Sequence, residues 1–98
     1  MEEIIIWESN GESIRACENA VYQALKDLGL KARVIINSEP PLISRNQLWE
    51  RLPVLEINGL YWSLHPGQPF TVAQMTGLLR KTLLAPPAEN TGGDVAAG

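Results

Sequence analysis

The 98 residues suffice for one small domain, and a chain that is 45% apolar and 19% charged has globular composition, which excludes disorder throughout. A net charge of −3 offers no basic surface for phosphates, so we expect neither nucleic-acid nor membrane partners. The single cysteine, Cys17, excludes an internal disulfide and a zinc site built on several thiolates, and no metal or other cofactor is expected.

The first predicted element is a strand at residues 3–8, where a short apolar run rich in β-branched and aromatic residues predicts burial on both faces. The acidic start, Met1 to Glu3, and this short apolar run fit neither a signal peptide nor a membrane span. We therefore expect a cytoplasmic protein.

A helix is predicted to follow, because Ser9 and Glu12 have the spacing of a capping box. Apolar residues then recur every three or four positions, which gives one buried stripe. The stripe contains Ile14, Cys17, Val21, Ala24, Leu25 and Leu28. Gly29 can take the left-handed conformation at the helix end, with Leu30 folding back on Leu25.

Residues 31–37 are predicted to form a second strand, which ends before Pro40 and Pro41 because proline removes backbone donors from the ladder. Residues 42–50 carry a weak helical pattern. A third strand at 53–57 and a fourth at 60–63 flank Asn58-Gly59, the dipeptide preferred in a type I′ hairpin turn.

The last predicted helix covers residues 72–84 after a loop at 64–69. Thr71 and Gln74 form a second capping box, and Phe70 is placed to staple onto Met75. The side chains expected to point inward are Val72, Met75, Leu78, Leu79 and Leu83. Residues 86–98 have too little apolar surface to offset the entropy of ordering, so we expect one domain at 1–85 and a disordered tail.

The order of elements, βαβαββα, predicts an α/β fold with a four-stranded mixed sheet and helices on both faces. In residues 3–84 the chain resembles the small thioredoxin and glutaredoxin-like family, which shares this order. The most specific part is 52–59, Leu-Pro-Val-Leu-Glu-Ile-Asn-Gly. It resembles the family segment in which a proline, usually cis, opens the third strand beside the active site.

One feature departs from that family. Redox-active members carry Cys-x-x-Cys, or its first cysteine, at the turn before the first helix, and residues 9–14 of this chain contain no sulfur. Gly11 and Ile14 occupy the positions where the thiols are expected. Dithiol exchange is thereby excluded, because attack and resolution both require a thiolate.

The first functional hypothesis is a redox-inactive, thioredoxin-like binding module. The resemblance implies a groove between the first helix and the Leu52-Pro53 bond that takes an extended peptide or a protein partner. Its predicted edge consists of Asn10, Gly11, Glu12, Leu52 and Pro53. Loss of the thiols would leave recognition without reaction, so the chain is not expected to be an enzyme.

Two alternatives remain open. Cys17 could serve as a monothiol oxidoreductase or thiol sensor, with its pKa lowered at the start of the first helix, although its place in the apolar stripe predicts burial as a small hydrophobe. The other is a structural homodimer through the predicted sheet edge, where Tyr61 and Trp62 point to opposite faces.

Overall fold

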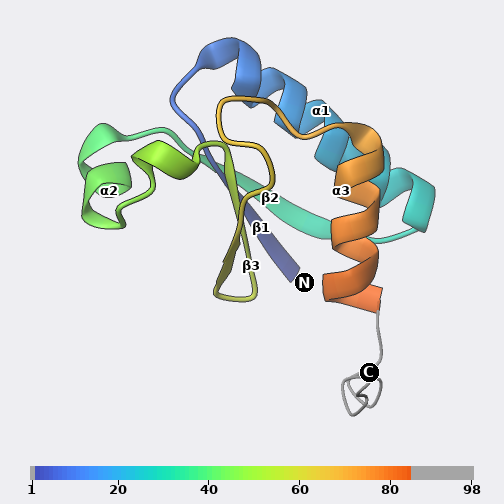
Figure 1. The fold of residues 1–98 in the computed structure, drawn as a ribbon. Coiled ribbons are helices and arrows are strands. Elements are labelled where there is room, and N and C mark those ends of the chain that lie inside the picture. The colour runs from blue at the N-terminus through green and yellow to red at the C-terminus, as the bar shows by residue number, and fades with distance from the viewer. Residues whose placement is uncertain (1, 85–98) are drawn as a thin grey trace, which may run out of the picture.

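The structure, a computed structural model, describes residues 2–84, and the predicted tail at 86–98 lies outside them. Four strands form one sheet in the order β2-β1-β3-β4 (Figure 1). They are β1 (Glu2–Trp7), β2 (Ala32–Asn37), β3 (Val54–Ile57) and β4 (Leu60–Trp62). β1 runs parallel to β2 and antiparallel to β3, and β3 and β4 form an antiparallel hairpin. The predicted α/β class and four-stranded mixed sheet are confirmed.

The helices lie against this sheet. They are α1 (Gly11–Leu28), α2 (Pro40–Arg45), the 3₁₀ turn η1 (Trp49–Arg51) and α3 (Val72–Leu79), which continues as a wider π-helical turn, η2 (Arg80–Leu84). α1 connects the two parallel strands, and α2 and η1 lie in the connection from β2 to β3. α1 and α3 lie beside each other, with α2 at the far side of the molecule (Figure 1).

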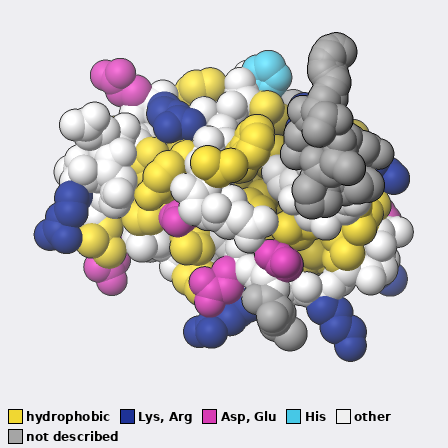
Figure 2. Space-filling model, turned by 90° about the horizontal axis from the view of Figure 1, so that it is seen from below, with side chains coloured by type: hydrophobic (Ala, Val, Ile, Leu, Met, Phe, Trp, Pro, Cys, Tyr) yellow, Lys and Arg dark blue, Asp and Glu magenta, His cyan; other side chains and the backbone are white. Residues whose placement is uncertain are grey.

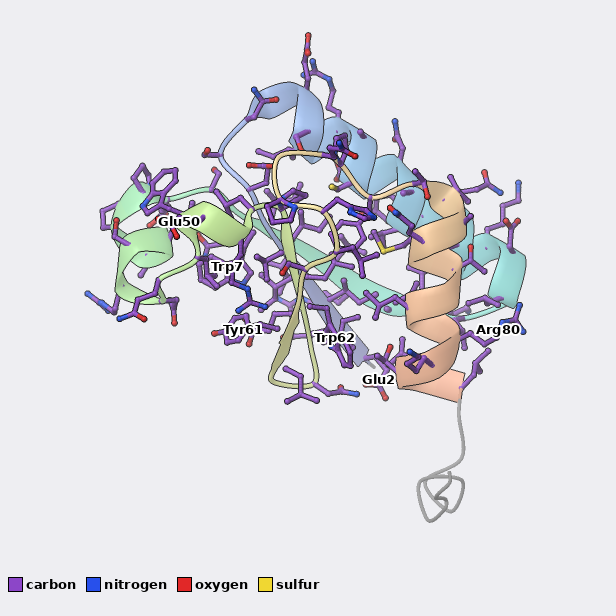
Figure 3. The ribbon with its side chains drawn as sticks, viewed as in Figure 1. Glu2, Trp7, Glu50, Tyr61, Trp62 and Arg80 are labelled. Carbon is purple, nitrogen blue, oxygen red and sulfur yellow. The ribbon has the colours of Figure 1, made fainter. Side chains whose placement is uncertain are left out.

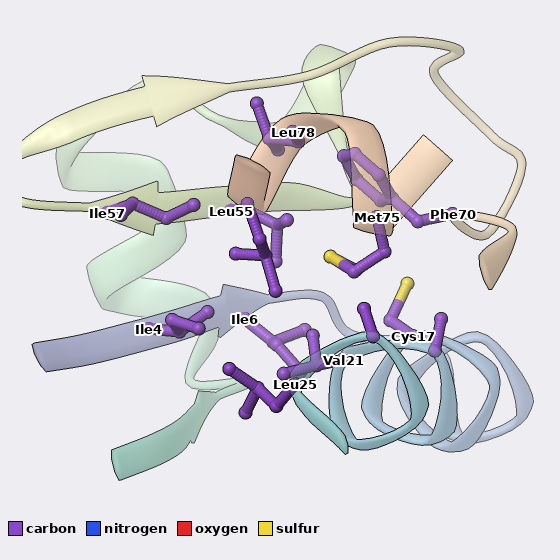
Figure 4. Packing of buried hydrophobic residues seen from close by; sticks show 13 residues of the cluster. Ile4, Ile6, Cys17, Val21, Leu25, Leu55, Ile57, Phe70, Met75 and Leu78 are labelled. Carbon is purple, nitrogen blue, oxygen red and sulfur yellow. The ribbon is translucent and has the colours of Figure 1, made fainter. Parts of the chain in front are cut away.

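The main core lies between one face of the sheet and the pair α1 and α3. Ile4 and Ile6 of β1 point to this face, as do Leu55 and Ile57 of β3. Side chains of α1 and α3 close over them, and Cys17 on α1 faces Met75 of α3 (Figure 4). Alternation along each strand therefore sends every second residue into one apolar layer.

The opposite face carries a smaller cluster that involves α2. Trp7 and Val54 pack there with Ile43 of α2 and with Leu48, and Ile5 is partly buried against them. Since Ile5 and Trp7 alternate with Ile4 and Ile6 along β1, the two clusters occupy the two faces of one sheet. Helices thus lie on both faces, as predicted, although α2 covers only the end of β1 near Trp7.

Several local predictions are confirmed. Asn58 and Gly59 have φ values of 54° and 81°, the positive values that a type I′ turn requires. Gly29 has φ 68°, its N–H donates to Lys26, and the N–H of Leu30 donates to Leu25 O at 2.9 Å, which is a Schellman ending. The capping box at the start of α3 is also present.

Three local predictions are wrong in part. Asn10, in extended conformation, caps α1 in place of Ser9. Val72, predicted to point inward, is exposed. It is the first residue of α3, and at this end of the helix the buried side chain is that of Phe70. The helix expected at 42–50 divides into α2 and η1, because Pro40 and Pro41 favour the first turn of a helix and Gln47, with φ 58°, interrupts it.

The cap can be tested by substitution. Asn10 Oδ1 accepts a hydrogen bond from the backbone N–H of Ser13 at 2.9 Å. We expect Asn10→Ala to lower the free energy of unfolding by about 1 kcal/mol, because a helix-start donor loses its acceptor. Ser9→Ala is the matched control and should change it by less than about 0.5 kcal/mol. Urea unfolding of both variants measures the difference, and an equal or larger loss in Ser9→Ala would assign the cap to Ser9.

Candidate functional site

One pocket of about 650 Å³ lies where the end of β1, the first turns of α1 and the segment before β3 meet. We name it the α1–β3 pocket. The residues that line it are Glu8, Ser9, Asn10, Glu12, Ser13, Ala16, Trp49, Glu50, Leu52, Gly67 and Pro69. They come from three parts of the chain that are distant in sequence, so the pocket is a product of the fold.

Glu8 forms the inner wall of this pocket and is 6% exposed. Its Oε1 accepts from the backbone N–H of Ser9 at 2.8 Å and of Asn10 at 3.4 Å, and its Oε2 accepts from the Ser13 hydroxyl at 2.7 Å. These donors offset the cost of burying a carboxylate. Because Glu8 occupies the N–H groups that precede α1, the turn has little capacity left to bind an anion.

Leu52 forms the opposite wall. Its peptide bond to Pro53 is cis, and its carbonyl oxygen accepts from the N–H of Gly67 at 2.8 Å. This bond brings the 64–70 loop over the segment before β3, so that Gly67 and Pro69 complete the rim. The carbonyl is therefore used within the chain.

The predicted groove and the observed pocket coincide in part. Asn10, Glu12 and Leu52 line the pocket, whereas Gly11 and Pro53 do not. Gly11 is the first residue of α1 and is exposed, and Pro53 is buried behind Leu52 at the start of β3. The structure thus brings the two predicted segments together around one hollow.

Eight lining residues were not predicted as site residues: Glu8, Ser9, Ser13, Ala16, Trp49, Glu50, Gly67 and Pro69. Ser13 and Ala16 follow from the helical period, since Ser13 lies three residues after the Asn10 cap and Ala16 lies four residues after Glu12. Trp49 and Glu50 depend on how η1 is oriented, and Pro69 depends on the path of the 64–70 loop. The sequence carries no local signal for either.

Cys17 lies outside the pocket. Its side chain is fully buried and points from α1 into the main core (Figure 4). Burial is the main cause that raises the pKa of this thiol, against smaller opposing hydrogen bonds from the Phe70 backbone and the Ser13 side chain. The predicted burial of Cys17 is confirmed. A neutral, inaccessible thiol has the opposite of the properties that an activated nucleophile needs.

The sheet edge at β4 has the predicted arrangement. Trp62 packs on the main core, while Tyr61 lies on the other face with its ring 6.4 Å from that of Trp7 (Figure 3). Trp7 is itself held by a hydrogen bond from Nε1 to Glu56 Oε1 at 3.0 Å. Two of the predicted interface aromatics therefore take part in contacts within the chain.

The edge of β4 is also partly blocked against strand pairing. Arg51 Nη2 donates to the carbonyl oxygen of Tyr61 at 3.4 Å, and β4 is only three residues long. Short edges with backbone groups already used are the features by which proteins avoid edge-to-edge association. Exposed apolar surface remains at Leu60. Seen from below, hydrophobic side chains lie on the surface of the molecule interspersed with charged ones (Figure 2). Dimerisation stays a prediction.

The rest of the described chain offers no second chemical centre. His65 is exposed in the 64–70 loop, and no group of three or more metal-ligating side chains occurs in residues 2–84. Within the same residues, no helix has the length and apolar character to cross a membrane. Comparison of the chain with protein-family models, curated proteins and solved structures finds no match.

Proposed function

We propose that the chain is a redox-inactive, thioredoxin-like binding module whose α1–β3 pocket takes an extended segment of a peptide or protein partner. The single observation that carries the proposal is the pocket itself, which is large enough for a few side chains and opens between α1 and Leu52. The buried Cys17 supports recognition without thiol chemistry.

The order and direction of the strands support the resemblance to the thioredoxin-like family. A parallel pair, β1 and β2, is joined by α1, and the β3-β4 hairpin extends the same sheet in antiparallel sense. This is the arrangement that the resemblance implies.

The proposal is tested by filling the pocket. Ala16→Trp introduces a large side chain from α1 into the lining, and Asn19→Trp introduces the same side chain at an exposed position of the same helix outside it. The probe is an array of immobilised dodecapeptides of random sequence, incubated with fluorescently labelled protein. Circular dichroism checks that both variants are folded.

We expect the wild-type protein to bind a subset of the peptides, Asn19→Trp to bind the same subset, and Ala16→Trp to lose at least about tenfold in affinity for them. Peptide binding that survives Ala16→Trp unchanged would place recognition elsewhere on the molecule. A wild-type protein that binds no peptide of the array would refute the proposed function.

A further inference from the structure

The pocket contains an aromatic side chain that is held in place and yet open to solvent. Trp49 is 44% exposed, and its Nε1 donates to the Ser44 hydroxyl at 2.7 Å. It lines the α1–β3 pocket and also a second hollow of about 360 Å³, which it shares with Gln47 and Glu50. Trp49 and Glu50 line both hollows, so the hollows adjoin at η1, and the exposed Trp49 indole can form a platform for a ligand that spans both.

The charge around this platform has one sign. Glu8, Glu12 and Glu50 line the α1–β3 pocket, and neither Lys nor Arg is among its described lining residues. Among residues 2–84 none of the three carboxylates has a cationic partner, since the ion pair found there joins Glu3 and Arg33 on the sheet. Glu50 belongs to η1, in the segment between α2 and β3, and lies beside α2 in the view of Figure 3.

Glu8 differs from the other two carboxylates. Its oxygens are satisfied by neutral donors of the chain, so its charge is buried at the inner wall without a cation. Glu12 and Glu50 are exposed, line the pocket and make no side-chain hydrogen bond within the described part of the chain. With two free carboxylates and one buried carboxylate in its lining, the pocket is complementary to a positively charged group.

We propose that the partner segment carries an arginine side chain, which stacks on the Trp49 indole with its guanidinium between Glu12 and Glu50. This inference rests on the proposed function, because it names the class of peptide for the same pocket. Arginine suits the platform because its planar group both stacks on an aromatic face and forms paired hydrogen bonds to carboxylates. The two hollows that Trp49 lines then take the residues that flank the arginine.

The test uses three pools of soluble, fluorescein-labelled heptapeptides whose neutral flanking residues are randomised. The central residue is arginine in the first pool, citrulline in the second and glutamate in the third. Citrulline keeps the shape of arginine without its charge. Fluorescence anisotropy measures binding to the wild-type protein, to Glu12→Gln/Glu50→Gln, to Trp49→Leu and to the control Glu18→Gln, which changes an α1 carboxylate outside the pocket.

We expect the arginine pool to bind about tenfold more tightly than the citrulline pool, and the glutamate pool to bind most weakly. The double glutamine variant should reduce the arginine preference to within about twofold, with citrulline affinity retained, whereas Glu18→Gln keeps the preference. Trp49→Leu should weaken both the arginine and citrulline pools. The preference should also shrink as salt is raised.

Equal binding of the three pools, all abolished by Ala16→Trp, would overturn this inference and leave the proposed function standing. An arginine preference that the double glutamine variant retains would also overturn it, because the selectivity would then come from another part of the surface. Absence of binding in every pool would contradict both proposals.

Discussion

Leu55→Ala is expected to lower the free energy of unfolding by about 3 kcal/mol, within the range of about 2 to 5 kcal/mol for such a truncation in a core. Leu55 is fully buried in β3, where its side chain lies between the sheet and the helix pair α1 and α3 (Figure 4). A domain of this size has about 5 to 15 kcal/mol in total. The loss is therefore a large share of its stability, and chemical denaturation should show the midpoint at much lower urea.

The matched control is Leu60→Ala in the same hairpin. Leu60 is 60% exposed, so its truncation removes little buried surface and should cost less than about 0.5 kcal/mol. A similar loss in the two variants would mean that the face of β3 toward α1 is not the centre of the core.

The thiol of Cys17 is expected to react with a thiol reagent about a thousandfold more slowly in the native protein than in guanidinium chloride at the same pH. Reagent can reach a fully buried sulfur only when the structure opens, and this factor corresponds to an opening free energy of about 4 kcal/mol. Burial also raises the pKa of the thiol, so the native side chain is neutral where a free cysteine begins to ionise.

A thiol moved to the surface provides the control for that measurement. In the double variant Cys17→Ala, Asn19→Cys, the new side chain lies on the exposed face of α1 and should react in the native state almost as fast as in denaturant. Fast native labelling of Cys17 in the wild-type protein would instead restore the monothiol oxidoreductase or sensor as the leading function.

Local features of the fold could be predicted because each depends on neighbouring residues. The Asn58-Gly59 turn, the Schellman ending at Gly29 and the capping box at Thr71 are set by the backbone conformations that a few side chains allow. The burial of Cys17 followed from the helical period alone. Because these local features mark the helices and strands in chain order, the α/β class could be predicted from them.

The start of α1 shows where such local rules become ambiguous. Ser9 and Asn10 are adjacent, and both residue types cap helices well. The Glu8 carboxylate accepts hydrogen bonds from the Ser9 N–H and the Ser13 hydroxyl. These bonds fix the turn so that the helix begins one residue later than predicted, with Asn10 as its cap. Burial of Glu8 was not predicted, since a carboxylate at a strand end is normally exposed.

The candidate pocket could be predicted only in outline. The resemblance led to the two segments around Asn10 and Leu52, and these do face each other. The rim depends on the bond from Gly67 N–H to the Leu52 carbonyl oxygen, which joins the irregular loop after β4 to the segment before β3. The exposure of Trp49 depends on the interruption at Gln47. Neither this hydrogen bond nor the exposure of Trp49 follows from a periodic pattern in the sequence, so neither could be predicted.

The proposed function depends most on whether the α1–β3 pocket binds a peptide while the rest of the surface does not. Titration of ¹⁵N-labelled protein with the arginine-centred peptide pool, followed by amide and indole NMR shifts, tests this directly. We predict shifts at Ser9, Ser13 and Leu52 and at the Trp49 indole N–H, with β4 unchanged. Shifts that gather on Leu60 to Trp62 and leave the pocket residues unmoved would contradict the account.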